Sequence, residues 1–296
     1  MKRIGLYLIT ACLLLLTGCS RQQVPVLPRE GNAVYYWRTV LALDSTEQAF
    51  LTHHDIRTLY CRYFDVVMDE QQGPMPNATL QFAQSVADSI EVVPTVFIMN
   101  DCMQGNVGGQ LDTLARRIVK RIVQMNETNE VKNVSEIQID CDYTLRNREV
   151  YYGFLKTIRS EARRQGLGLS VTIRLHQLSM PPPPADYGVL MLYNTGEPER
   201  FAERNPILDL RDVKPYLPYL KDYALPMGAA YPVFLWQRIL HGVRIDHVAD
   251  YDEVMRTKRL VEAERNDLRQ LIMTYHLDKE NIHRYTLQQY EAIYHH

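Results

Sequence analysis

What this sequence of 296 residues lacks excludes several kinds of chemistry. It contains no Cys-x-x-Cys pair, so a zinc site is not expected. It also lacks a P-loop, a His-Glu-x-x-His motif and a serine nucleophile elbow, which mark phosphate-binding, metalloprotease and α/β-hydrolase sites. Basic residues do not outnumber acidic ones, and a formal net charge of −2 is not the footprint of a nucleic-acid-binding protein. We therefore expect no metal, no cofactor and no nucleic acid.

The apolar run near the N-terminus, residues 4–16, is shorter than the roughly 20 residues that a membrane-spanning helix needs. It follows Lys2 and Arg3 and precedes the sequence Leu-Thr-Gly-Cys, which ends at Cys19. This arrangement resembles a bacterial lipoprotein signal, which implies cleavage before Cys19 and a lipid on its thiol. Ser20 and the lack of an acidic run after it imply an outer-membrane anchor facing the periplasm.

The chain is expected to divide into three parts. Residues 1–18 are the signal peptide, and residues 19–32, which carry two prolines and no periodicity, are a tether. Residues 33–296 suit a single domain of the size that α/β barrels reach. This domain holds three cysteines, so at most one disulfide can form among Cys61, Cys102 and Cys141.

Strand-like and helix-like patterns alternate along the domain. The strand-like segments, which are rich in β-branched and aromatic residues, are 33–40, 58–67, 91–100, 136–144, 167–177, 187–196, 224–234 and 236–245. The helix-like segments include 44–54, with a capping signal at Ser45 or Thr46, and 79–89, 108–127 and 147–166. Residues 250–280 are predicted to form terminal helices.

This alternation predicts parallel strands joined by crossover helices. Seven or eight strands are the number that a closed (β/α)8 barrel needs, and this TIM-type fold, with extra C-terminal helices, is our predicted fold class. A doubly wound open sheet is the alternative, weakened by the absence of a Gly-rich phosphate loop after the first strand. The four prolines 181–184 cannot be helical and predict a stiff extended loop after the fifth strand.

The parity of two neighbouring strands indicates which side chains share a face, because alternate side chains of a strand point in opposite directions. The apolar set, which includes Ile137, Ile139, Val171 and Ile173, is predicted to pack under the helices. The opposite set is polar and is predicted to point into the barrel: Gln138, Asp140, Asp142, Ser170, Thr172, Arg174 and His176.

Other strand ends supply further candidates for the same face. Arg38 and Arg62, from the first two strands, are candidates to pair with the aspartates from across the barrel. The sixth strand ends near Tyr193 and Glu197, and Trp236 follows a later strand. Buried charges must pair with each other or bind something, so two interpretations remain open. The charged residues form a structural ion-pair layer, or they form a ligand site at the strand ends, where barrel enzymes keep their active sites.

Two resemblances bear on the function. The segments YYWRT, LYCRYFDV, IQIDCDYT, SVTIRLHQL and LMLYNTG resemble a family of uncharacterised lipoproteins from Bacteroides-type bacteria, and the resemblance implies a glycosidase-like (β/α)8 barrel and a carbohydrate ligand. A weaker resemblance is to chitinase-type barrels, whose fourth strand ends in Asp-x-x-Asp-x-Asp-x-Glu. Asp140 and Asp142 match the second and third aspartates of that motif. Ile137 replaces the first aspartate, and Thr144 replaces the glutamate that serves as the acid.

The departure at Thr144 matters because a threonine hydroxyl is too weak an acid to protonate a leaving group. A substitute acid would have to come from Asp65, Asp101 or Glu197, and Asp142 with Glu197 is the preferred pair. The first hypothesis is therefore a lipid-anchored glycosidase-like protein that binds and hydrolyses a glycan through Asp140, Asp142 and Glu197. The second is a glycan-binding or scaffold lipoprotein without catalysis. In both, the expected ligand-binding residues are Arg38, Arg62, Arg174, His176, Tyr193 and Trp236.

Overall fold

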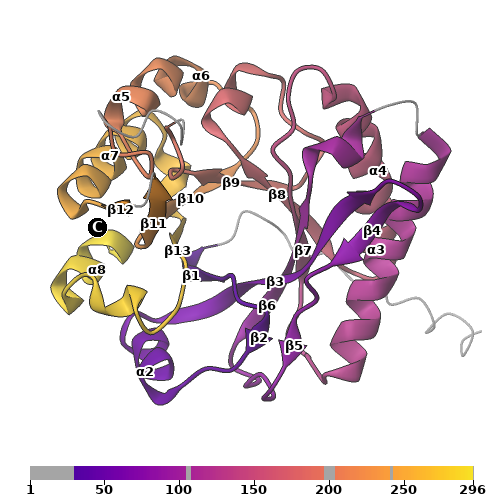
Figure 1. Ribbon diagram of the computed structural model, residues 1–296, viewed down its shortest axis with the longest axis horizontal. Coiled ribbons are helices and arrows are strands. Elements are labelled where there is room, and N and C mark those ends of the chain that lie inside the picture. The colour runs from indigo at the N-terminus through magenta and orange to yellow at the C-terminus, as the bar shows by residue number, and fades with distance from the viewer. Residues whose placement is uncertain (1–29, 105–107, 197–203, 241–242, 296) are drawn as a thin grey trace, which may run out of the picture.

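The computed structural model describes residues 30–104, 108–196, 204–240 and 243–295 of the chain. They form a (β/α)8 barrel of the TIM type, and Figure 1 shows its closed ring of strands with helices around it. Each strand pairs in parallel with the next, and the last pairs with the first. The eight strands, in chain order, are β1 (Gly31–Tyr36), β3 (Ile56–Asp69), β6 (Glu91–Ile98), β7 (Glu136–Asp140), β8 (Gly168–Ile173), β9 (Tyr187–Met191), β10 (Met227–Pro232) and β13 (Leu271–Tyr275).

The helices surround the strands. The longer ones are α2 (Ser45–His53), α3 (Gly108–Thr128), α4 (Arg148–Arg164), α7 (Tyr251–Glu264) and α8 (Leu287–Tyr294), with the short α5 (Leu210–Val213) and α6 (Leu217–Lys221) between β9 and β10. Short 3-10 turns are η2 (Asn100–Met103), η3 (Leu175–Ser179), η4 (Lys214–Tyr216), η5 (Asn266–Arg269) and η6 (Asn281–His283). The helix predicted for residues 108–127 is confirmed, and it buries Leu111, Leu114, Ile118 and Ile122, with Met125 partly buried against the core. No helix in these described ranges is long and apolar enough to cross a membrane.

The helix predicted for residues 79–89 is wrong. The chain leaves β3 through an antiparallel hairpin with β4 (Gly73–Asn77), and the short strand β5 (Gln81–Phe82) then pairs with β2 (Val40–Leu41). Leu80 is the only fully buried residue of the segment, so a helix there would have had no apolar stripe to bury. The crossover from β3 to β6 therefore lacks a helix.

The eighth barrel strand also lies elsewhere than predicted. Residues 236–245 belong to an antiparallel hairpin of β11 (Leu235–Leu240) and β12 (Val243–Val248), which does not join the barrel. The strand that closes the barrel is β13, inside the region predicted to hold only helices. It has five residues between charged segments, so helical periodicity on both sides concealed it.

The capping signal of α2 also differs by one residue from the prediction. The N-cap is Asp44, whose carboxylate accepts hydrogen bonds from the backbone N–H groups of Thr46 and Glu47. The Glu47 carboxylate in turn accepts a hydrogen bond from the backbone N–H of Asp44, which completes a capping box.

The barrel interior holds Gln138, Asp140, Ser170 and Thr172, as strand parity predicted, whereas the side chains of Asp142 and His176 are 59% and 41% exposed. The Tyr35 hydroxyl donates to Gln138 at 2.8 Å, and the Tyr60 and Ser170 hydroxyls donate to Glu136 at 3.0 and 2.9 Å. The opposite set, including Ile137, Ile139, Val171 and Ile173, packs in the layer under the helices. Cys61, Cys102 and Cys141 are buried as free thiols, and burial raises the pKa of each.

His54 ends α2 inside a cage of aromatic rings from α2 and α8. Its ring lies 4.6 Å from Phe50 and 5.6 Å from both Tyr290 and Tyr294, measured between ring centroids. The residue is fully buried, and neither ring nitrogen has a hydrogen-bond partner among the described residues. Burial, assisted by neighbouring His53, lowers the pKa of His54 to about 4.

Acid is therefore expected to destabilise the fold through His54. The unfolded chain takes up a proton on this ring near pH 6.5, and the folded protein only near pH 4. The stability that the neutral His54 ring contributes to the folded state is therefore fully present above pH 6.5 and is lost as the pH falls towards 4. The loss should be on the order of 2 kcal/mol. Urea unfolding at pH 4.5 and 7 should show a smaller pH dependence for His54→Phe than for the wild type. Equal pH dependence would contradict this role.

Candidate functional site

The carboxyl-terminal ends of the eight barrel strands meet at one end of the molecule, which we call the open face. Asp140 ends β7 and Arg174 directly follows β8, which is its neighbour in the sheet. The Arg174 guanidinium lies 3.2 Å from Asp140 Oδ1, and the Thr172 hydroxyl donates to the same oxygen at 2.7 Å. Asp140 is 4% exposed and the Arg174 side chain 21%, so the carboxylate of this ion pair is buried. Burial would lower the pKa of Arg174, but the negative charges led by Asp140 outweigh burial and raise it.

A second polar pair, His176 with Asp142, lies at the rim of the open face. His176 Nε2 is 3.4 Å from Asp142 Oδ1 and 3.2 Å from the backbone carbonyl oxygen of Tyr143. A carbonyl oxygen only accepts hydrogen bonds, so Nε2 carries the hydrogen of this contact. The Asp142 side chain is 59% exposed, in contrast to that of Asp140. Asp142 is therefore a carboxylate that a ligand on this face can reach.

Aromatic rings converge beside these charges, around Tyr275 at the end of β13. Tyr193 stacks on Tyr275 at 4.6 Å between centroids, with 25° between the ring planes. Trp37 and Phe234 approach Tyr275 at 5.8 and 5.5 Å. Tyr35 adds a fourth ring at 5.7 Å. Burial raises the pKa of both Tyr193 and Tyr275, so their hydroxyls remain neutral donors at physiological pH. We call these five residues the aromatic floor.

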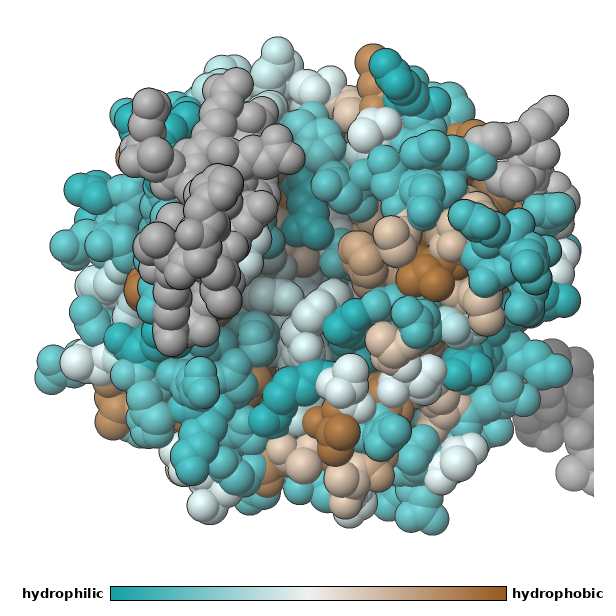
Figure 2. Space-filling model, in the orientation of Figure 1, coloured by the Kyte–Doolittle hydropathy of each residue, from teal (hydrophilic) through white to brown (hydrophobic). Residues whose placement is uncertain are grey.

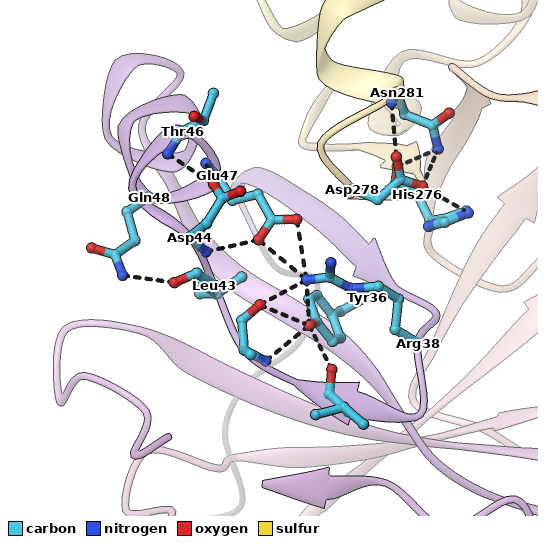
Figure 3. A network of polar contacts seen from close by, with 12 residues as sticks. Tyr36, Arg38, Leu43, Asp44, Thr46, Glu47, Gln48, His276, Asp278 and Asn281 are labelled. Carbon is cyan, nitrogen blue, oxygen red and sulfur yellow. Dashed lines mark hydrogen bonds and ion pairs between the residues drawn. The ribbon is translucent and has the colours of Figure 1, made fainter. Parts of the chain in front are cut away.

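Other predicted site residues lie further from the aspartates. Arg62 pairs with Asp65, with Nε 2.7 Å from Oδ1, and its guanidinium lies 5.6 Å from the centre of the Trp37 ring. Arg62 therefore lies at the edge of the aromatic floor. The Asp65 carboxylate is occupied by its ion pair with Arg62. The predicted convergence of Arg38 on the aspartates is wrong. Its guanidinium contacts Glu47, 3.1 Å away, and the Tyr36 hydroxyl, where it holds the loop between β1 and α2 (Figure 3).

Two cavities open among the residues of this face. The first, about 190 Å³, is lined by Asp142, Arg174, His176, Tyr193 and Asn194. The second, about 520 Å³, is lined by Trp236, Tyr275, His276 and Asp278, and it shares Asn194 with the first. Figure 2 shows a hollow near the centre of the face turned to the viewer. A larger cavity of about 600 Å³ lies between α2 and residues 84–90.

The chitinase-type acid position has a structural role here. The Thr144 backbone N–H donates to Asn147 Oδ1 at 2.8 Å, and the Thr144 hydroxyl contacts the same oxygen at 3.3 Å. Asn147 in turn donates to Asn100. The position thus links the loops after β6 and β7 and offers no carboxyl group.

Glu197 and Cys19 lie outside the described residues. No group of three or more His, Cys, Asp or Glu side chains in the described ranges is arranged to hold a metal ion.

The sequence prediction missed several residues of this face. Trp37, Tyr35 and Tyr275 form much of the aromatic floor, and His276 lines the second cavity. Tyr275 was missed because β13 was not recognised as a strand. Tyr275 is two residues beyond Met273, which packs in the barrel interior, so alternation along a recognised strand would have predicted that Tyr275 points to the same side.

The fold and the site together define a (β/α)8 barrel whose open face carries charged pairs beside an aromatic floor. Solved structures with this fold include a chitinase from Chromobacterium violaceum, with a TM-score of 0.56 and 13% identity, covering 89% of this chain and 98% of that one. The spore cortex-lytic enzyme SleL of Bacillus cereus has a TM-score of 0.55 at 13% identity, covering 91% and 75%. A chitinase from Bacteroides thetaiotaomicron has a TM-score of 0.54 at 10% identity, covering 91% and 99%.

These similarities show the fold that the chain shares with chitinase-like barrels. No protein-family model matches the chain, and no curated protein matches its sequence.

The Asp140–Arg174 pair leads to a stability prediction. Arg174→Met leaves the Asp140 carboxylate buried without its cation, so it should destabilise the fold by about 3 kcal/mol. The double variant Asp140→Asn/Arg174→Met should recover most of that loss, because no charge is then left unpaired. Asp142→Asn, which changes an exposed carboxylate, should alter the free energy of unfolding by less than about 0.5 kcal/mol. Urea unfolding measures all three. A loss from Asp142→Asn as large as that from Arg174→Met would contradict the assignment.

Proposed function

We propose that the open face binds a glycan and that the barrel does not cleave it by the chitinase mechanism. The observation that carries the proposal is the aromatic floor beside Arg174 and the exposed Asp142, in a hollow at the strand ends. Within the aromatic floor, Trp37, Phe234 and Tyr275 are partly exposed, whereas Tyr35 and Tyr193 are buried. Partly exposed aromatic rings offer apolar faces on which sugar rings stack, and charged side chains at the rim bind hydroxyl groups. The shared fold with two chitinases and a spore cortex-lytic enzyme makes a chitin-type glycan the first ligand to test. The resemblance to glycosidase-like lipoproteins of Bacteroides-type bacteria points to carbohydrate as well.

The site chemistry of the described residues supports the absence of cleavage by the chitinase mechanism. The acid position holds Thr144, Asp140 is engaged by Arg174 and Thr172, and Asp65 is engaged by Arg62. Hydrolysis needs two carboxyl groups about 5–5.5 Å apart for retention or 6.5–9.5 Å apart for inversion. Hydrolysis with Asp142 and Glu197 is the second candidate function, favoured by the exposed Asp142 carboxylate with a histidine beside it.

Binding and turnover distinguish the two candidates. On an array of polysaccharides and chitin oligomers, the protein lacking residues 1–19 should bind at least one glycan. Incubation with the bound glycan should release no new reducing ends. Asp142→Ala should weaken binding several-fold without changing the melting temperature, because a charged hydrogen-bond partner at the rim is lost. Turnover that Asp142→Asn abolishes would instead establish the hydrolase, and binding to no glycan would overturn the proposal.

We also propose that a lipid on Cys19 anchors the protein to the outer membrane, facing the periplasm. The support is the basic pair Lys2 and Arg3, the apolar run 4–16 and the sequence Leu-Thr-Gly-Cys. The mature protein should fractionate with membranes and carry the mass of a diacylglyceryl group. Cys19→Ala should move it to the soluble fraction or leave the signal uncleaved. A processed, unlipidated wild-type protein in the soluble fraction would contradict the anchor.

A further inference from the structure

The second cavity of the open face is built from different parts of the chain than the first. Its apolar wall comes from Phe234 and Trp236 near β11 and from Tyr275 at the end of β13. Its polar wall is the turn that follows β13 and contains η6. Its volume of about 520 Å³ lies within the range of roughly 300–1,000 Å³ of small-molecule sites.

The polar wall is rigidly held. Asp278 Oδ1 accepts the backbone N–H of Asn281 at 2.8 Å, and Oδ2 accepts the Asn281 amide at 2.9 Å. That amide also donates to the His276 carbonyl oxygen at 3.0 Å, and His276 Nε2 lies 3.4 Å from Asp278 Oδ2. Figure 3 shows these three side chains in contact with one another. Burial lowers the pKa of His276 although Asp278 opposes the shift, so the ring is neutral at neutral pH.

Three other polar groups of the cavity have binding capacity left. The Arg284 guanidinium donates from Nε to Asn281 Oδ1 at 3.2 Å, which leaves its two terminal nitrogens as donors for a ligand. The side chains of Glu280 and Asn194, both exposed, make no hydrogen bond or ion pair within the described residues. A carboxylate, an amide and a guanidinium facing an aromatic wall present donors and acceptors around a stacking surface. Sugar rings combine hydroxyl groups on their edges with apolar C–H faces, so they match this combination.

Asn194 joins the two cavities. It lines both, and its backbone has φ of +52°, a left-handed conformation that asparagine tolerates better than most residues with a side chain. The first cavity alone, at about 190 Å³, falls below the range of ligand sites. A ligand held by Arg174 and Asp142 therefore extends beyond the first cavity. Because Asn194 lines both cavities, the ligand extends past Asn194 into the second cavity.

We propose that the second cavity is an additional sugar subsite, so that the ligand is an oligosaccharide that passes Asn194 and ends on Trp236. The inference rests on the proposed glycan binding and adds the ligand's length and direction. A monosaccharide occupies only one of the two cavities. A longer oligomer contacts both and gains the stacking on Trp236.

Chain-length dependence of affinity tests the inference on the full chain. Calorimetric titration uses N-acetylglucosamine and its β-1,4-linked dimer, tetramer and hexamer as probes. Affinity should rise about tenfold or more from the monosaccharide to the longer oligomers, as an added stacked sugar contributes on the order of 1 kcal/mol. Trp236→Ala should remove most of this gain. Asn194→Gly keeps the left-handed backbone, removes the amide and should reduce the gain as well.

A matched control is Tyr219→Ala, which removes an aromatic ring that is 51% exposed on α6 and lines neither cavity. It should bind every oligomer as the wild type does. Equal affinity for the monosaccharide and the hexamer, or a full length gain in both Trp236→Ala and Asn194→Gly at unchanged melting temperature, would overturn the inference and leave the proposed function standing. No binding of any probe would instead overturn glycan binding of the chitin type, and with it the inference.

Discussion

Closure of the sheet is the constraint on which the rest of the structure depends. β1 pairs in parallel with β13 on one side and with β3 on the other, so that Asn32 is in register with both Ile272 and Ile56. All eight strands are parallel, and closure therefore brings all their carboxyl ends to one rim. The aromatic floor is a direct product of this closure, because its rings come from the ends of β1, β9 and β13 and the segment after β10. An open sheet would place the first and last strands at opposite edges.

The charged residues divide into those that hold the barrel and those that a ligand can reach. Asp140 and Arg174 satisfy each other below the surface, and Arg38 and Glu47 do so at the outer wall. Such pairs are retained because a lone buried charge costs several kcal/mol. Asp142 differs only by its position two residues beyond Asp140, where β7 has ended and the side chain lies at the rim. The two interpretations left open by the sequence thus apply to different residues, with Asp140 in an ion-pair layer and Asp142 in the candidate binding site.

Much of this arrangement could be predicted from the sequence because alternation in buried strands is a strong signal. The pattern of 136–144 and 167–177 correctly predicted the interior positions of Gln138, Asp140, Thr172 and Arg174. Arg38, a candidate to pair with the aspartates from across the barrel, instead pairs with Glu47, and its neighbour Trp37 packs on the interior residue Tyr35. The sequence pattern also failed to predict β13, whose five residues lie between charged segments. Only pairing with β1 and β10, a contact between distant parts of the chain, defines that strand.

The two tryptophans of the chain can report on glycan binding at the aromatic open face. Trp37 belongs to the aromatic floor and Trp236 lines the second cavity, so both indole groups report on this face. An NMR titration of the 15N-labelled protein with a chitin hexamer follows the two indole N–H signals. Both signals should shift in a saturable manner. Saturable binding of the hexamer with both indole signals unmoved would place the glycan elsewhere and contradict glycan binding at this face.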